Sequence, residues 1–147
     1  MSQIGLDALV VDGDSRSLQM LADILVQEGF TTRCAGTLAE ARQALRKWMP
    51  RLIVAEHVLP DGNGTKLLSK LRRLEKLGRH TTTAVIIITA YSTVDSAVEA
   101  LRLGAFEYLS KPIDVSKLQA VLARVARLPD EEEKFARMRA ELHDHRR

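Results

Sequence analysis

Residues with reactive side chains stand at or just after the ends of several short apolar runs. Asp12 and Asp14 follow "ALVV", Glu56 follows "LIVA", Thr89 ends "AVIIIT", and Lys111 comes soon after the last run. This set holds three carboxylates, one hydroxyl and one ammonium. It suits a hard divalent cation beside a phosphoryl group, provided that the fold brings the positions together.

The apolar runs alternate with amphipathic stretches through the first 128 residues. This alternation is typical of βα units that build a parallel sheet. The predicted strands are 8–11, 31–35, 52–55, 84–89 and 106–109. The third and fourth are apolar without alternation, as expected of strands that helices cover on both faces. Ligands of such sheets bind outside the carboxyl ends of the strands, which is where the reactive residues stand.

Helices are predicted between the strands, from apolar residues at three- and four-residue spacing. Their ranges are 18–25, 38–48, 65–77, 94–103 and 115–127. Thr37 and Asp114 are suitable N-caps for two of them, and Gly29 is a suitable stop for the first. Pro129 marks the domain boundary. We therefore expect a domain over 5–128 and a C-terminal helical extension or linker over 129–147.

The extension begins with the acidic run "DEEE" and continues with Phe135, Met138 and Leu142 at helical spacing. Acidic residues favour a helix N-terminus, so a last amphipathic helix is predicted. Its apolar residues would pack on the domain or pair with a second copy.

Composition narrows the class of protein. The chain has 147 residues, of which 46% are hydrophobic and 28% charged, enough for one globular domain with a real core. Its single cysteine, Cys34, cannot form an intrachain disulfide. No membrane-spanning run and no secretory signal are visible, so a cytoplasmic location is expected. The net charge of +3 and the basic run over 66–80 favour a solvated helix face over nucleic-acid binding.

Three segments together resemble a response-regulator receiver domain of the CheY-like type: "LVVDGDSRSL", "LIVAEHVLPDGNG" and "VIIITAYSTVDSAVEALRLGAFEYLSKPID". The resemblance covers about residues 5–128. The segment 89–114 is most similar to receivers of the nitrogen-regulator class, which precede an ATPase that activates sigma-54 transcription. The resemblance implies a flavodoxin-like, doubly wound parallel sheet of order 2-1-3-4-5 with five flanking helices.

The resemblance also assigns roles to single residues. Asp12 matches an acid that helps to hold Mg²⁺, Gly13 stands where a second acid is usual, and Asp14 is the nearest substitute ligand. Thr89 and Lys111 match the hydroxyl and ammonium that contact the acyl phosphate. Tyr108 matches the switch aromatic, and the bond from Lys111 to Pro112 is cis in the family.

Glu56 stands where the family has its phosphoacceptor aspartate. Its carboxylate lies about 1.5 Å farther from the backbone, the length of one C–C bond, and in-line phosphoryl transfer tolerates such misplacement badly. We therefore expect a pseudo-receiver that is not an enzyme and has no resident cofactor. Glu56 would reach towards Thr89 and Lys111 and imitate part of the phosphoryl charge.

The output surface implied by the family lies on the fourth helix, fifth strand and fifth helix. Its candidate residues here are Ala97, Leu101, Val121 and Arg124. A protein partner or effector domain and a homodimer are the expected assemblies, without direct contact to nucleic acid or membrane.

Other interpretations stay open at this point. Asp12 and Asp14 would also serve as helix caps, Glu56 with Lys111 as a plain ion pair, and Tyr108 as packing. The main alternative is a phosphorylatable receiver that binds Mg²⁺ through Asp12 and Asp14 and accepts phosphate from a histidine kinase. A flavin-binding protein shares the fold but would need a phosphate cradle that the first loop lacks.

Overall fold

The computed structural model describes residues 6–78 and 83–128. Its strands are β1 (Asp7–Val11), β2 (Thr31–Ala35), β3 (Leu52–Glu56), β4 (Val58–Leu59), β5 (Gly62–Asn63), β6 (Ala84–Thr89) and β7 (Glu107–Ser110). Its helices are α1 (Ser15–Gln27), α2 (Leu38–Lys47), α3 (Lys66–Lys76), α4 (Val94–Arg102) and α5 (Val115–Ala126). The predicted extension over 129–147 lies outside the described residues.

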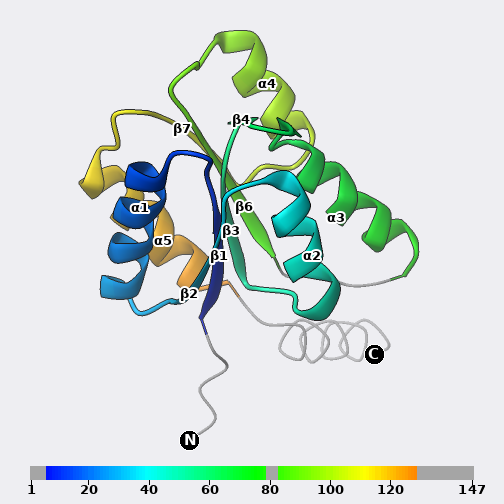
Figure 1. The fold of residues 1–147 in the computed structure, drawn as a ribbon, viewed down its shortest axis with the longest axis horizontal. Coiled ribbons are helices and arrows are strands. Elements are labelled where there is room, and N and C mark those ends of the chain that lie inside the picture. Colours follow the sequence, from blue (N-terminus) through cyan, green and yellow to red (C-terminus); the bar gives the residue numbers. More distant parts are fainter. Residues whose placement is uncertain (1–5, 79–82, 129–147) are drawn as a thin grey trace, which may run out of the picture.

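Five strands form one parallel sheet in the order β2-β1-β3-β6-β7. Counting only these five strands, the order is the predicted 2-1-3-4-5, so the doubly wound α/β fold is confirmed. The order reverses at β1, which pairs with both β2 and β3. In Figure 1, α1 and α5 cover one face of the sheet and α2 and α3 cover the other.

The core consists of one apolar layer on each face of the sheet. Leu9, Ile53 and Ile87 pack with α2, α3 and α4, while Val10 and Val54 pack with α1 and α5. Successive strand residues point to opposite faces, so a run such as "AVIIIT" supplies both layers. Every residue of β3 and β6 is buried, as the lack of polar alternation predicted.

A small hairpin between β3 and α3 was not predicted. Its strands β4 and β5 are two residues each and pair antiparallel through Val58 with Asn63 and Leu59 with Gly62. Runs this short carry no hydrophobic periodicity, which is why sequence patterning missed them. Pro60 and Asp61 form the turn between them, with residue types that favour turns.

The predicted element boundaries differ from the observed ones by small amounts. β3 continues to Glu56 and β7 runs from Glu107 to Ser110, so each extends one residue further towards the site than expected. α1 starts three residues before the expected Leu18, since Asp14 caps its first turn. In the described ranges, 6–78 and 83–128, no helix is long and apolar enough to cross a membrane.

Candidate functional site

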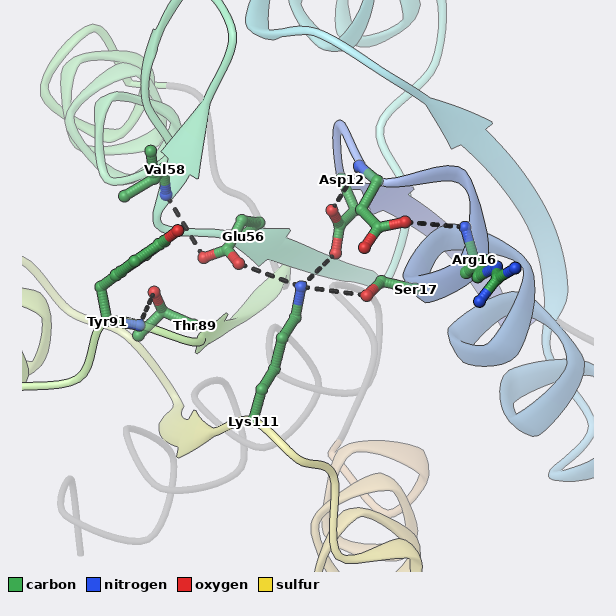
Figure 2. A network of polar contacts seen from close by, with 9 residues as sticks. Asp12, Arg16, Ser17, Glu56, Val58, Thr89, Tyr91 and Lys111 are labelled. Carbon is green, nitrogen blue, oxygen red and sulfur yellow. Dashed lines mark hydrogen bonds and ion pairs between the residues drawn. The ribbon is translucent and has the colours of Figure 1, made fainter.

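The reactive residues gather at the carboxyl edge of the sheet. Asp12 directly follows β1, Glu56 and Thr89 end β3 and β6, and Lys111 directly follows β7. Because these strands are parallel and their order places β1, β3 and β6 side by side, their carboxyl ends lie together. Figure 2 shows the side chains of Asp12, Glu56 and Lys111 converging on one another.

Lys111 is the centre of this network. Its Nζ lies 2.8 Å from Asp12 Oδ2 and 3.0 Å from Glu56 Oε1, and it donates to Ser17 Oγ at 3.2 Å. Asp12 is 2% exposed and Glu56 is 6% exposed. One ammonium therefore serves two buried carboxylates that would otherwise repel each other.

The ionisation of Lys111 reflects this arrangement. Burial of the ammonium works to lower its pKa, but the hydrogen bonds to Asp12 and Glu56 and the Coulombic attraction of these two carboxylates together outweigh burial and raise the pKa of Lys111 above its ordinary value. The side chain stays charged throughout the neutral range.

Glu56 contacts Lys111 as expected, but the expected contact with Thr89 is absent among the described hydrogen bonds. The second carboxylate oxygen of Glu56 accepts from the backbone N–H of Val58 at 3.3 Å. The hydroxyl oxygen of Thr89, which is fully buried, accepts from the N–H of Tyr91 at 3.1 Å. Each side chain thus holds its own loop, so only half of the expected phosphoryl imitation is present.

Asp14 acts as the N-cap of α1, which was one of its two interpretations. Its Oδ1 accepts from the N–H of Arg16 at 3.0 Å, and its own N–H donates to Asp12 Oδ1 at 2.9 Å. Gly13 lies against Pro60, and a Cβ atom there would stand 2.9 Å from Pro60 Cδ. A side chain at position 13 would therefore displace the Pro60 ring.

These contacts bear on whether the residues fit Mg²⁺. The two buried carboxylates, Asp12 and Glu56, already share the Lys111 ammonium, and Asp14 is bonded to the helix terminus. Gly13 supplies no side-chain donor. Among the described residues, no group of three or more His, Cys, Asp or Glu side chains has a geometry that could hold a metal ion. In the structure as folded, the Lys111 ammonium competes with Mg²⁺ for both buried carboxylates, so binding of the ion would require these contacts to open.

A cavity of about 430 Å³ opens over the network. Asp12, Glu56 and Lys111 contribute its polar lining, and Val58 and Tyr91 contribute apolar surface beside them. Tyr91 is 68% exposed and Val58 is 52% exposed. The site is thus an open hollow with an ion-paired lining rather than a closed pocket.

Two hydroxyl contacts tie the neighbouring loops and were not anticipated from the sequence. Tyr108 is half-buried, and its hydroxyl lies 2.6 Å from Ser96 Oγ in the first turn of α4. Ser110 donates to Ser92 Oγ at 2.8 Å. The sequence feature that could have placed Ser96 in that first turn is the capping box formed by Thr93 and Ser96.

The candidate output residues divide into exposed and buried ones. Leu101 is 51% exposed, Ala97 is half-buried, and Arg124 is exposed with its guanidinium 3.5 Å from Glu107. Val121 is wrong as a surface residue, because it is 5% exposed and packs in the core from the sheet-facing side of α5. Periodicity alone does not show which side of a helix near the sheet edge is covered.

Two exposed residues of α4 were missed. Val94 and Val98 are 80% and 47% exposed, and they precede Leu101 at helical spacing. We call these three residues the α4 apolar stripe. Residues at i, i+4 and i+7 lie on one face of a helix, so the stripe is continuous.

Comparison with known proteins identifies the family of this fold and site. The family model described as "Response regulator receiver domain" matches residues 8–123. The response regulator protein PilR of Pseudomonas aeruginosa is 36% identical over 128 residues, covering 86% of this chain and 28% of PilR. The regulatory protein AtoC of Escherichia coli is 35% identical over 120 residues, covering 82% of this chain and 25% of AtoC. The chain thus spans about a quarter of the length of these relatives.

Solved structures agree. The receiver domain of a LuxO-type repressor from Vibrio parahaemolyticus superimposes with a TM-score of 0.76 at 26% identity, covering 96% of each chain. The beryllofluoride-activated NtrC4 receiver domain dimer gives a TM-score of 0.72 at 30% identity, covering 81% of this chain and 94% of that one. The bond from Lys111 to Pro112 is cis, as the resemblance implied. The chain therefore belongs to the response regulator receiver domain family of two-component signalling.

Proposed function

We propose that this receiver domain acts without phosphorylation, as a protein-interaction module in transcription regulation. The observation that supports the proposal is the shared ion pair, in which Lys111 Nζ lies 2.8 Å from Asp12 and 3.0 Å from Glu56. The carboxylate at the position that would accept phosphate is already bound by the lysine.

The chemistry of phosphoryl transfer supports this proposal. An attacking carboxylate oxygen must lie in line with the leaving group, and an error of about 1 Å costs on the order of 100-fold in rate. Glu56 is displaced by about one C–C bond relative to an aspartate. Its two oxygens are engaged by Lys111 and by the N–H of Val58. Mg²⁺, which would orient the phosphoryl donor, would have to displace Lys111 from the two carboxylates.

In place of phosphorylation, the ion pair of Lys111 with Asp12 and Glu56 holds the loops at this edge of the sheet together. Lys111 lies just after β7, and its contacts join that edge of the sheet to β1 and β3. Glu56 presents one charge and two oxygens where a phosphoryl group presents nearly two charges and three oxygens. The domain is thereby biased towards one conformation permanently.

The proposed output surface is the α4 apolar stripe with the neighbouring exposed face of α5. The occupant we propose is a second copy of this chain, because the NtrC4 receiver domain is solved as a dimer. The dimer formed through this surface would contact an effector domain of a nitrogen-regulator-type activator in the cytoplasm. PilR and AtoC are themselves named as regulators.

A second candidate function is that of a working phosphoacceptor which takes phosphate from a histidine kinase. The observation in its favour is the cavity of about 430 Å³ above Glu56, with Lys111 in its lining. This function requires Lys111 to release Glu56 and Asp14 to leave its cap so that Mg²⁺ can bind.

An amide NMR titration separates the two functions. The purified chain is titrated with Mg²⁺ and then with Mg²⁺ plus beryllofluoride, a stable substitute for the acyl phosphate. We expect no saturable shifts at Asp12, Glu56, Thr89 and Lys111. Saturable shifts there that spread to Tyr108 would overturn the proposal and establish the phosphoacceptor.

Variants at position 56 test the permanent bias. Glu56→Gln keeps the shape of the side chain but removes its charge, so we expect shifts at Lys111, Ser96 and Tyr108 and weaker self-association. The matched control is Asp23→Asn on α1, an exposed carboxylate that accepts from Gln19 of the same helix. If Glu56→Gln leaves both the spectrum and the self-association as in the control, Glu56 has no such role.

A further inference from the structure

The two helices α2 and α3 carry a concentrated positive charge that the site does not use. They hold eight basic residues against two acidic ones, a net charge of +6, whereas the whole chain has a net charge of +3. We define the basic surface as the eight residues Arg42, Arg46, Lys47, Lys66, Lys70, Arg72, Arg73 and Lys76. Six of them are exposed, and Arg42 and Lys70 are half-buried.

The two acids of these helices pair with only one base of the basic surface in the part of the chain that the structure describes. Glu75 pairs with Arg72 at 3.8 Å, and Glu40 accepts from the N–H of Gly36. Among the described residues, the other seven bases make no ion pair within 4.0 Å.

Like charges also repeat at helical spacing along α3. Lys66 precedes Lys70 by four residues, and Arg73 follows Lys70 by three and precedes Lys76 by three. Like charges at this spacing repel each other and destabilise a helix. Binding of an anionic group to the basic surface would therefore reduce this repulsion.

The chain itself contains a matching anionic segment. Residues 130–133 are "DEEE", four successive acids that begin two residues after Leu128. α5 ends at Ala126, and like α2 and α3 it runs from the carboxyl edge of the sheet to the amino edge. The C-terminal ends of all three helices thus lie at the same edge, with α5 on the opposite face from α2 and α3 (Figure 1).

The segment is long enough to cross that edge. The five residues from Leu128 to Glu133 span up to about 17 Å when extended, so the docking requires this stretch to precede the predicted amphipathic helix rather than to form its first turn. Helices packed on opposite faces of a sheet lie roughly 20 Å apart, about 10 Å for each layer, and the side chains of Glu, Lys and Arg add reach at both ends. Lys47 and Lys76 end α2 and α3, so they are the nearest bases to this edge.

We propose that the acidic segment 130–133 docks on the C-terminal end of the basic surface, around Arg46, Lys47, Arg73 and Lys76. In this proposal the acidic segment is held on the α2–α3 side of the sheet. It is independent of the state of Glu56. Because its charges are exposed, the contact weakens as salt is added.

Paramagnetic relaxation on the full chain tests the docking. A nitroxide is attached at Ala136→Cys in a Cys34→Ser background, and amide signals are recorded at low and high salt. We expect signal loss at the ends of α2 and α3 at low salt, and recovery at high salt. Reversing two charges with Arg46→Glu and Lys47→Glu abolishes the loss at α2, whereas the matched control Lys117→Glu on α5 leaves it intact.

Two further samples decide between this contact and other occupants. The variant with residues 130–133 changed to Asn and Gln, carrying the same label, loses the effect if the acids bind the basic surface. Isotope-labelled protein mixed with spin-labelled, isotope-free protein reveals contact between copies. Signal loss in that mixture, or loss that is insensitive to salt and to the Asn and Gln changes, overturns docking of the chain's own acidic segment.

Discussion

At the scale of single residues, the site depends on one ammonium. Lys111 contacts Asp12, Glu56 and Ser17, and its side chain is 16% exposed. Removing one partner of a buried ion pair leaves uncompensated charge in a low-dielectric environment, which is more costly than the pair itself is favourable. Lys111 therefore stabilises the domain as well as defining the site.

Lys111→Met should lower the free energy of unfolding by about 3 kcal/mol at neutral pH. This is the lower end of the usual cost, since the ammonium keeps some contact with water. The raised pKa of Lys111 sets the sign of the pH dependence. The advantage of the wild type is fully present below the unfolded lysine pKa of about 10.4 and is lost as pH rises through the higher folded value.

Urea denaturation at neutral and alkaline pH measures this difference. Lys117→Met on α5 is the matched control, because that position is exposed. Adding Glu56→Gln to Lys111→Met should recover part of the loss, since it removes one of the two facing charges. Additive losses in the double variant would show that the residues do not act as a network.

At the scale of elements, the hairpin of β4 and β5 connects the site to α2. Asp61 in its turn accepts from the N–H groups of Leu38 at 2.7 Å and Ala39 at 3.0 Å. A carboxylate at a helix N-terminus satisfies free N–H groups and complements the helix dipole. The hydrogen bonds from Leu38 and Ala39 lower the pKa of Asp61 below its ordinary value.

Asp61→Asn should destabilise the domain at neutral pH and not at strongly acidic pH. A lowered folded pKa contributes stability that is present above the unfolded pKa of about 3.9 and is lost as pH falls through the folded value. Urea midpoints of the wild type and the variant should thus converge as the pH is lowered below about 4. A difference that stays constant with pH would mean that hydrogen bonding alone, rather than charge, holds α2.

The β6–α4 loop and β7 are held by hydroxyl contacts rather than by charge. Thr89 accepts from the Tyr91 N–H, Ser92 accepts from Ser110, and Ser96 contacts the Tyr108 hydroxyl. Hydrogen bonds of this kind contribute about 1 kcal/mol each, far less than the burial of a core strand. The α4 side is thus the weakly held part of the site, and the Lys111 side is the strongly held part.

At the scale of the whole molecule, the helices present two different surfaces. The basic surface of α2 and α3 suits an anionic segment, and the α4 apolar stripe suits an apolar partner. Exposed apolar residues that form a continuous patch are a common mark of a protein interface. The two surfaces can therefore serve different contacts at the same time.

Leu101→Glu should weaken self-association of the chain by roughly tenfold or more, because a charge would be placed in the centre of the proposed interface. Sedimentation velocity over a concentration series measures the dissociation constant. Val26→Glu on α1 is the matched control, with 60% exposure on the opposite face of the sheet. If both variants associate like the wild type, the α4 apolar stripe is not the dimer surface.

The sequence by itself determined the parallel α/β fold, because strand and helix periodicities are local and the five units repeat them clearly. It also placed Asp12, Glu56, Thr89 and Lys111 at one edge, since every such residue follows a strand of a parallel sheet. Gly13 and Glu56 departed visibly from the family pattern. These features needed only the order and type of residues along the chain.

Only the tertiary structure decided how these side chains pair. Thr89 lies at the predicted edge but bonds to its own loop, Asp14 caps α1, and Val121 is buried on the sheet-facing side of α5. The partner of each polar group depends on differences of a few tenths of an ångström in the distances to its neighbouring donors and acceptors. Those distances depend on packing between segments far apart in the sequence, so local patterns do not contain them.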